Sequence, residues 1–287
     1  MMRNLSTLFL FCLVLFCLDC QSQDEIRLII RGDDIGSSHA ANLGCIISYQ
    51  EGIMQSVEIM VPCAWFPEAI KMLNENPGLD VGVHITFTSE WENIKWRPLT
   101  NAPGITDDDG YFFPLIWPGD RVPADQSLKG SDWKPEEIEA EMRAQIELAI
   151  KHIPQLSHLS CHMGCSGWDE EVAAIYSRLA KEYKLNIPTS DYGVERFPLA
   201  GKGETSEERI NDFIEGLNKL EGGKTYLFVE HPALESMEMS AVGHEGYENV
   251  NQDRQMVTEL FTSKEVMKVI EERGIQLISY ADLVTGD

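Results

Sequence analysis

The stretch Ile26-Arg27-Leu28-Ile29-Ile30-Arg31-Gly32-Asp33-Asp34-Ile35-Gly36 joins a short, mostly apolar run directly to two adjacent carboxylates. Such a run is typical of a strand buried on both faces of a parallel sheet. In α/β barrels the active site lies where the strands end, and two neighbouring anions there are costly unless a cation or a proton compensates them. The stretch therefore predicts a buried strand that ends at a divalent-metal site. A turn or a helix-capping pair is the alternative that these residues alone leave open.

Beyond this stretch, short apolar runs alternate with amphipathic segments of helical length. We expect strands at residues 26–31, 55–61, 79–87, 156–162, 185–190, 225–229 and 275–280. Between them, apolar residues recur every four positions from Ile138 to Ile150, which predicts a helix behind Pro135. Thr262 and Glu265 predict a capping box for a last helix that Gly274 ends. The alternation indicates an α/β fold, a barrel-like domain of about seven βα units.

The chain shows no internal repeat or linker, so we expect a single domain over residues 23–287. Residues 1–22 differ, because Arg3 is followed by an apolar run from Leu8 to Leu18 that is short for a membrane span. This segment predicts a secretory signal peptide. Cys20 follows the run closely and could carry a lipid anchor. We therefore expect an exported protein that is periplasmic, secreted or lipid-anchored, with no transmembrane span.

The charge of the chain excludes one class of partner. Its 287 residues include 23 Lys or Arg and 47 Asp or Glu, a formal net charge of −24. A surface this acidic repels a polyphosphate, which argues against a nucleic-acid ligand. Hydrophobic residues at 43% and charged residues at 24% are ordinary globular values and exclude a mainly disordered chain.

Three further predicted strands deliver histidines to the same end of the sheet. His84 lies near the end of 79–87, His162 ends 156–162 on the same face as His158, and His231 follows 225–229. Each histidine alone could be a satisfied core residue, but their shared position predicts a metal-dependent hydrolytic site. One carboxylate and two imidazoles leave positions open for water and substrate, as catalytic metal sites require. These ligand types do not choose between zinc and magnesium.

Two predicted connections, residues 88–134 and 232–261, are too long to be simple turns. Long connections in compact α/β domains usually serve a site. The first contains six aromatic residues: Trp91, Trp96, Tyr111, Phe112, Phe113 and Trp117. These rings could stack on the apolar faces of sugars, or they could pin the loop to the protein.

Several motifs, in order along the chain, resemble one family. They are Arg31 to Gly36, Asn42, Glu51 to Ile53, Asn76 to Thr86, Ser157 to His162, Glu230-His231-Pro232, and Arg254 with the segment from Gly274 to Leu283. This set resembles the YdjC/ChbG-like carbohydrate deacetylases and covers essentially the whole chain after the leader. The resemblance implies a distorted (β/α) barrel related to polysaccharide deacetylases, in agreement with the strand count.

The resemblance also implies an activity: removal of an acetyl group from an N-acetylated sugar or oligosaccharide with one divalent ion, magnesium or zinc. Carried over by position, Asp34, His84 and His162 would hold the metal and Asp33 would be the general base. Two positions depart from the family. Ser160 replaces its usual acid, and Gly164 stands where many members have a further histidine. Both departures bear on the orientation of His162 and on substrate choice, because residues that hydrogen-bond to a metal ligand set its orientation and basicity.

Other residues complete the predicted site. His231 is the candidate acid that protonates the departing sugar amine. Trp96, Arg97 and Arg254 are candidate substrate-binding residues, and the two arginines could instead orient Asp33. Two alternatives remain open: another metallohydrolase or sugar isomerase on a similar barrel, and a catalytically inactive, exported glycan-binding protein.

Overall fold

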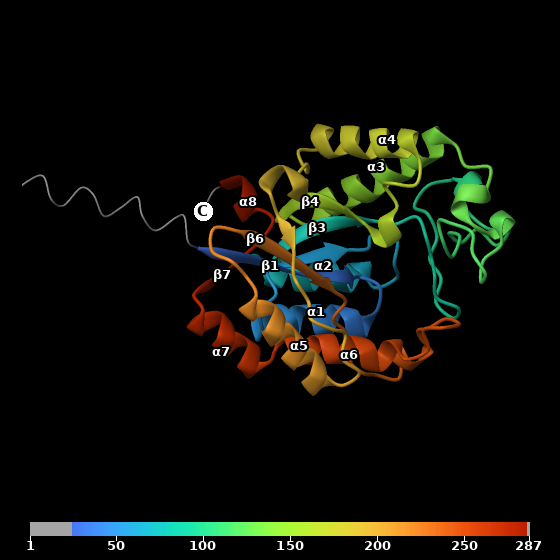
Figure 1. Cartoon of the computed structure of the whole chain (residues 1–287). Coiled ribbons are helices and arrows are strands. Elements are labelled where there is room, and N and C mark those ends of the chain that lie inside the picture. Colours follow the sequence, from blue (N-terminus) through green and yellow to red (C-terminus); the bar gives the residue numbers. More distant parts are fainter. Residues whose placement is uncertain (1–24, 286–287) are drawn as a thin grey trace, which may run out of the picture.

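A computed structural model describes residues 25–285, and its seven strands form one sheet (Figure 1). Every pairing is parallel, and the main order is β4-β3-β2-β1-β6-β5, with β7 paired to β1. The strands are β1 (Ile26–Ile35), β2 (Ser56–Ile59), β3 (Asp80–Ile85), β4 (Leu156–Cys161), β5 (Glu195–Arg196), β6 (Thr225–Glu230) and β7 (Ile275–Ile278).

The long strand β1 organises this sheet. Its residues Arg27–Gly32 pair with β6, while β7 and β2 pair with successive parts of β1, Ile26–Ile29 and Arg31–Ile35. Within residues 25–285 the outermost strands β4 and β5 are not paired with each other. The predicted α/β barrel-like fold is therefore confirmed as a curled, open half-barrel.

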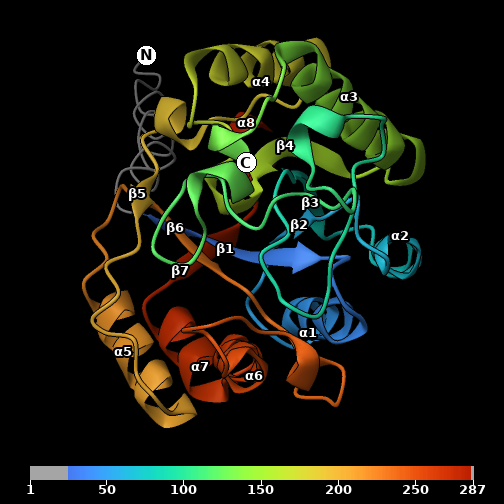
Figure 2. The same cartoon turned by 90° about the vertical axis from the view of Figure 1, so that its right-hand side faces the viewer.

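Helices surround the sheet, as Figure 2 shows in a view toward the strand ends. They are α1 (His39–Gln50), α2 (Phe66–Glu75), α3 (Pro135–His152), α4 (Glu170–Glu182), α5 (Ser206–Asn218), α6 (Val250–Phe261), α7 (Lys264–Glu272) and the short α8 (Asp282–Thr285). The helix expected behind Pro135 is confirmed as α3. Buried side chains of the strands, such as Leu28 and Ile30 of β1, pack in the main core with those of the helices. Each such side chain stabilises the fold by about 1.5–3 kcal/mol relative to exposure.

One expected strand is wrong. Residues 185–190 form no strand, although Leu159 of β4 still donates a backbone hydrogen bond to the Leu185 carbonyl at 3.1 Å. Pro188 has no N–H to continue such a ladder, and the chain enters a 3₁₀ turn at Thr189–Tyr192 instead. The strand that pairs with β6 in this region is the two-residue β5.

The C-terminal part needs two further corrections. The long connection 232–261 contains helix α6. The cap of α7 is Ser263, whose Oγ accepts from the Val266 N–H, whereas Thr262 Oγ1 donates to the Thr258 carbonyl at 2.8 Å. The expected capping box is therefore wrong: the helix is capped one residue later, and Val266 at the third helical position cannot complete a box. Gly274 does end the helix, and its φ of 62° is one that a glycine adopts without strain.

The connection between β3 and α3 is pinned by its own aromatic residues. Trp91, Trp96, Phe112 and Phe113 are buried, and the Phe112 ring packs edge-on against Phe87. Trp117 differs, because 45% of its surface is exposed. Most of these rings thus build the loop, and Trp117 is left as an exposed aromatic surface.

The predicted signal peptide and Cys20 lie outside the described residues. In the part of the chain from residue 25 to residue 285, no helix has both the length and the apolar character needed to cross a bilayer.

Candidate metal centre

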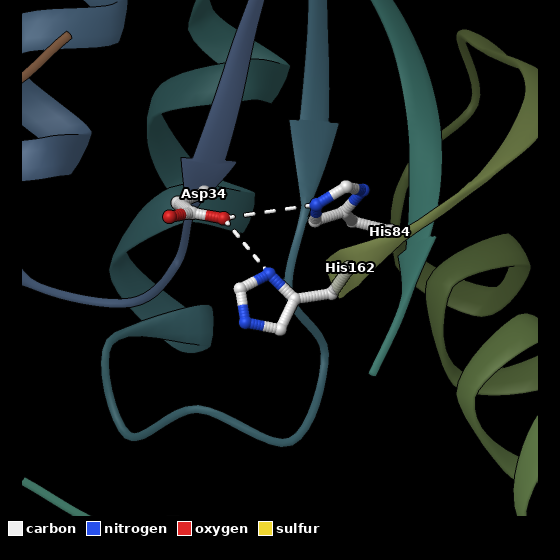
Figure 3. Close-up of side chains that lie close together, drawn as sticks. All are labelled: Asp34, His84 and His162. Atoms are coloured by element: carbon white, nitrogen blue, oxygen red, sulfur yellow. Dashed lines mark ion pairs between the residues drawn. The ribbon is translucent and has the colours of Figure 1, made fainter. Parts of the chain in front are cut away.

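Three side chains from three strand ends meet at one point (Figure 3). Asp34 Oδ1 lies 3.7 Å from His84 Nε2 and 3.4 Å from His162 Nδ1. All three residues are buried, and one potential ligand atom from each lies within 4.8 Å of the others. They come from the ends of β1, β3 and β4, so the structure brings together the three residues that the sequence nominated as metal ligands.

A β-bulge at the end of β1 places two consecutive carboxylates in this site. Gly32 pairs with Val57 and Ile35 pairs with Ile59, so β1 holds one extra residue over this interval. Asp34 has a φ of 74°, a left-handed conformation that Asp tolerates better than most residues. Consecutive strand residues normally point to opposite faces, and a bulge re-aims them. As a result, Asp33 Oδ2 also lies near His84 Nε2, at 3.8 Å.

Asp33 is held by an arginine from its own strand. Arg31 Nε donates to Asp33 Oδ1 at 2.7 Å, and Arg31 Nη2 donates to Asp33 Oδ2 at 2.8 Å. Such a two-point contact fixes the carboxylate in orientation as well as in position. Arg31 was not among the site residues predicted from the sequence. The available signal was its spacing of two residues from Asp33, which puts both side chains on one face of a strand.

Asp34 is held by Arg254 of helix α6, whose Nη2 donates to Asp34 Oδ2 at 2.8 Å. Burial acts to raise the pKa of Asp34, but Arg254, His231 and His162 together outweigh it and keep this pKa well below its ordinary value. The second oxygen, Oδ1, is buried and makes no hydrogen bond to any described residue. An ionised carboxylate oxygen without a hydrogen bond, facing two imidazoles, fits a divalent cation.

The two histidines of the site differ in protonation. Burial lowers the pKa of His84 to about 4, so its ring is neutral near pH 7. Burial also acts to lower the pKa of His162, but the carboxylates of Glu90 and Asp34 outweigh it and raise this pKa to about 10. His162 Nε2 lies 3.0 Å from Glu90 Oε2. Glu90 follows β3 in the long connection and was not among the site residues predicted from the sequence.

His231 lies directly after β6, with its Nδ1 3.8 Å from Glu230 Oε2. Its surroundings act to lower its pKa by desolvation, but the nearby Asp34 carboxylate and Glu230 outweigh this and raise the pKa. The side chain is 40% exposed, which leaves it accessible to a ligand. Its assignment as an acid stays a prediction.

The three predicted substrate-binding residues occupy different places. Arg254 contacts Asp34, as described above. Trp96 is buried, its indole N–H donates to the Thr88 carbonyl at 2.7 Å, and its ring meets His162 edge-on. Arg97 is exposed, with its guanidinium 4.2 Å from the centroid of the Tyr111 ring. The structure thus brings Trp96 and Arg254 to the ligand residues, whereas Arg97 packs on the surface of the loop.

A cavity of about 500 Å³ reaches Arg31, the residue that holds Asp33. Its walls come from β1, β6 and the segment around β5, and they include Arg31, Arg196, Phe197, Val229 and Glu230. Arg31 is the hydrogen-bond partner of Asp33, and Glu230 precedes His231. The cavity therefore borders the immediate neighbours of both residues that were predicted to transfer protons.

Known proteins resemble this chain along most of its length. The family model described as YdjC-like protein matches residues 27–272. A carbohydrate deacetylase of Thermus thermophilus is 32% identical over 240 residues, covering 75% of this chain and 80% of that protein. A carbohydrate deacetylase of Brevibacillus brevis is 26% identical over 273 residues, covering 90% of this chain and all of that protein. A crystal structure from Enterococcus faecalis, named as a candidate cellobiose-phosphate cleavage protein, shares the fold with a TM-score of 0.68 at 24% identity, covering 90% of this chain and 99% of that one.

Proposed function

This chain belongs to the YdjC-like family, and from that premise we propose that it is a metal-dependent carbohydrate deacetylase, a hydrolase that removes acetyl groups from N-acetylated sugars or oligosaccharides. The observation that carries this proposal is the buried cluster of Asp34, His84 and His162, in which Asp34 Oδ1 makes no hydrogen bond among the described residues. A carboxylate and two imidazoles are a suitable ligand set for zinc and can also accept magnesium.

Asp34, His84 and His162 would hold the ion. When bound, a divalent ion polarises the acetyl carbonyl and lowers the pKa of water. Asp33 lies beside this set and is the proposed general base. Arg31 holds both of its oxygens by one hydrogen bond each, and a carboxylate keeps further acceptor positions for the proton of a water molecule.

His231 is the proposed general acid. Its raised pKa favours the imidazolium, which can donate a proton to the nitrogen of the departing sugar amine. It lies at the end of β6, the strand that pairs with β1 on the side away from β2. The proposed base, Asp33, and the proposed acid, His231, therefore lie at the ends of neighbouring strands. This placement suits proton transfer from water and to the leaving amine of one substrate.

We propose that the sugar occupies the cavity between β1, β6 and β5. The cavity presents charged groups for hydroxyls, such as Arg196 and Glu230, together with the apolar ring of Phe197. These are the kinds of contact that fix the orientation of a sugar in a site. The exposed Trp117 is a second candidate surface, close to Gly164 beside the ligand His162.

The test is acetate release from a panel of N-acetylated and O-acetylated sugars and oligosaccharides. We expect release from N-acetylated substrates, loss on chelation, and recovery with added zinc or magnesium. Phosphoester and free-aldose substrates test the alternative of another barrel metallohydrolase or an isomerase. A chain that binds glycans without releasing acetate would support the inactive, glycan-binding alternative instead.

Two matched variants connect this activity to the site. Asp34→Ala removes the carboxylate of the proposed ligand set, whereas Asp253→Ala removes another buried carboxylate, which pairs with Arg209. We expect Asp34→Ala to lose both bound metal and acetate release, and Asp253→Ala to keep bound metal. Full metal retention in Asp34→Ala would contradict the ligand assignment.

We also propose that the protein is exported. This proposal rests on residues 1–22 alone, with lipid attachment at Cys20 as one form of export. Cell fractionation, with and without replacement of Cys20, would separate a lipid-anchored protein from a free exported one.

A further inference from the structure

Glu58 of β2 is a fully buried acid that the site described above does not use. Its Oε1 lies 2.6 Å from His158 Nε2 and 3.7 Å from Arg31 Nε. Its Oε2 accepts a hydrogen bond from the Ser160 hydroxyl. A buried carboxylate is costly unless cations and hydrogen bonds compensate it, and here they are supplied by Arg31 of β1 and by His158 and Ser160 of β4.

Ser160 connects this acid to a proposed metal ligand. Its Oγ lies 2.7 Å from His84 Nδ1, on the side of the ring opposite Nε2. A hydroxyl has one proton to donate, and an ionised carboxylate can only accept. Because Ser160 donates to Glu58, it must accept from His84, so the proton of the neutral ring lies on Nδ1. The lone pair of Nε2 is then free, and Nε2 is the atom 3.7 Å from Asp34 Oδ1.

We propose that Glu58, acting through Ser160, holds His84 in the tautomer and orientation that let its Nε2 bind the metal. Glu58 and Ser160 are positioning residues in this arrangement, and the inference rests on the proposed role of His84 as a metal ligand. A hydrogen-bond partner on the nitrogen that does not bind the metal fixes the orientation of the histidine ring and raises the basicity of the ligating nitrogen. Glu58 thereby supplies, from β2, the acid that position 160 lacks in this chain.

The surroundings of Glu58 are built around it. A Cβ atom on Gly82 of β3 would collide with Glu58 Oε2 and lie 2.6 Å from His158 Nε2, so a side chain at this position would displace the pair. His158 in turn stacks on Tyr280, with ring centroids 3.9 Å apart and planes 6° apart. Residues of β1, β3 and β4, together with Tyr280 after β7, thus fix the position of the Glu58 carboxylate. A fixed position is needed if Glu58 is to orient His84 through Ser160.

Ser160→Ala tests the link from Glu58 through Ser160 to His84, because it removes only the hydroxyl oxygen that joins them. The matched control is Ser48→Ala, because the Ser48 hydroxyl in α1 is also buried but makes no hydrogen bond among the described residues. Zinc binding to the full chain is measured by calorimetry, and the tautomer of His84 by ¹H–¹⁵N spectra of the metal-free, histidine-labelled protein. We expect Ser160→Ala to weaken zinc binding by about 10- to 100-fold and to reduce the Nδ1–H tautomer of His84. Ser48→Ala should change neither.

Glu58→Gln and a rescue variant make the test specific. The amide introduced by Glu58→Gln can donate to Ser160, which then can donate to His84 Nδ1 and move the ring proton to Nε2. Glu58→Gln should therefore weaken zinc binding as well, and the losses of the two single variants should not add. The double variant Glu58→Gln with Ser160→Asp places a carboxylate directly at Nδ1 and should restore zinc binding.

Zinc binding by Ser160→Ala as tight as in the wild type, or an unchanged His84 tautomer in that variant, would overturn the inference. A wild-type protein that binds neither zinc nor magnesium would instead refute the proposed function. In that case the tautomer spectra of the metal-free protein still decide whether Glu58 and Ser160 position His84.

Discussion

Replacing Arg254 by Met tests how much the charge of Arg254 stabilises the protein, because methionine has a similar length but no charge. Arg254 and Asp34 are both buried and are joined at 2.8 Å. Removing the guanidinium while keeping a side chain of similar length leaves the Asp34 carboxylate without its arginine partner. Breaking a buried pair in this way costs about 3–5 kcal/mol in the free energy of unfolding. In the metal-free protein at pH 7 we expect a loss of that order.

Added metal should reduce this loss. A divalent ion held by Asp34, His84 and His162 supplies positive charge beside the same carboxylate, so the variant gains more from the ion than the wild type does. The assay is unfolding by urea and by heat, each with chelator and with zinc. For a domain of roughly this size, each kcal/mol moves the unfolding temperature by about 2–4 °C. The gap between Arg254→Met and wild type should be large with chelator and smaller with zinc.

Arg209→Met is the matched control. Arg209 is also buried and pairs with a carboxylate, Asp253, but Asp253 is not among the proposed ligands. Its loss of stability should be similar in size and the same with or without zinc. If zinc binds the wild type but leaves the gap for Arg254→Met unchanged, then Arg254 does not balance the charge of a metal ligand.

Three further predictions concern proton transfer. Asp33→Asn should retain metal and lose roughly 10²–10⁴-fold in acetate release, because an amide cannot accept the proton of water; near-normal release would make Asp33 structural. His231→Ala should slow release from an N-acetyl sugar by a similar factor but affect an activated acetyl ester much less, and equal losses would remove the acid role. The raised pKa of His162, about 10, means that this ring carries a proton at pH 7 that metal must displace, whereas the His84 ring is already neutral. Apparent metal affinity should therefore rise about tenfold per pH unit from pH 7 toward pH 9, and calorimetry in buffers of different ionisation enthalpy should show about one proton released per ion; a pH-independent affinity would contradict this pairing.

The strand pattern was sufficient for the parallel fold and for placing Asp34, His84 and His162 at one edge of the sheet, and the family resemblance singled these three out as ligands. The reason is local: apolar runs identify buried strands, and the carboxyl ends of parallel strands lie at one edge of the sheet. A residue placed just before or after such an end is therefore located by its own strand. The same argument failed for residues 185–190, where an apolar run is interrupted by Pro188, which cannot donate to a ladder.

Only the tertiary structure decided which partner each of these groups has. Arg254 reaches Asp34 across 220 positions of sequence, and Glu58 reaches His84 through Ser160 of a strand 102 positions away. Such contacts depend on where α6 packs and on the register of β2, β3 and β4, which no local pattern encodes. The bulge that turns Asp33 and Asp34 toward one site is likewise a property of the pairing between β1 and β2. Sequence thus determines where the ionisable groups stand along the strands, and packing determines their charge state, because a pKa depends on burial and on neighbours that are distant in the chain.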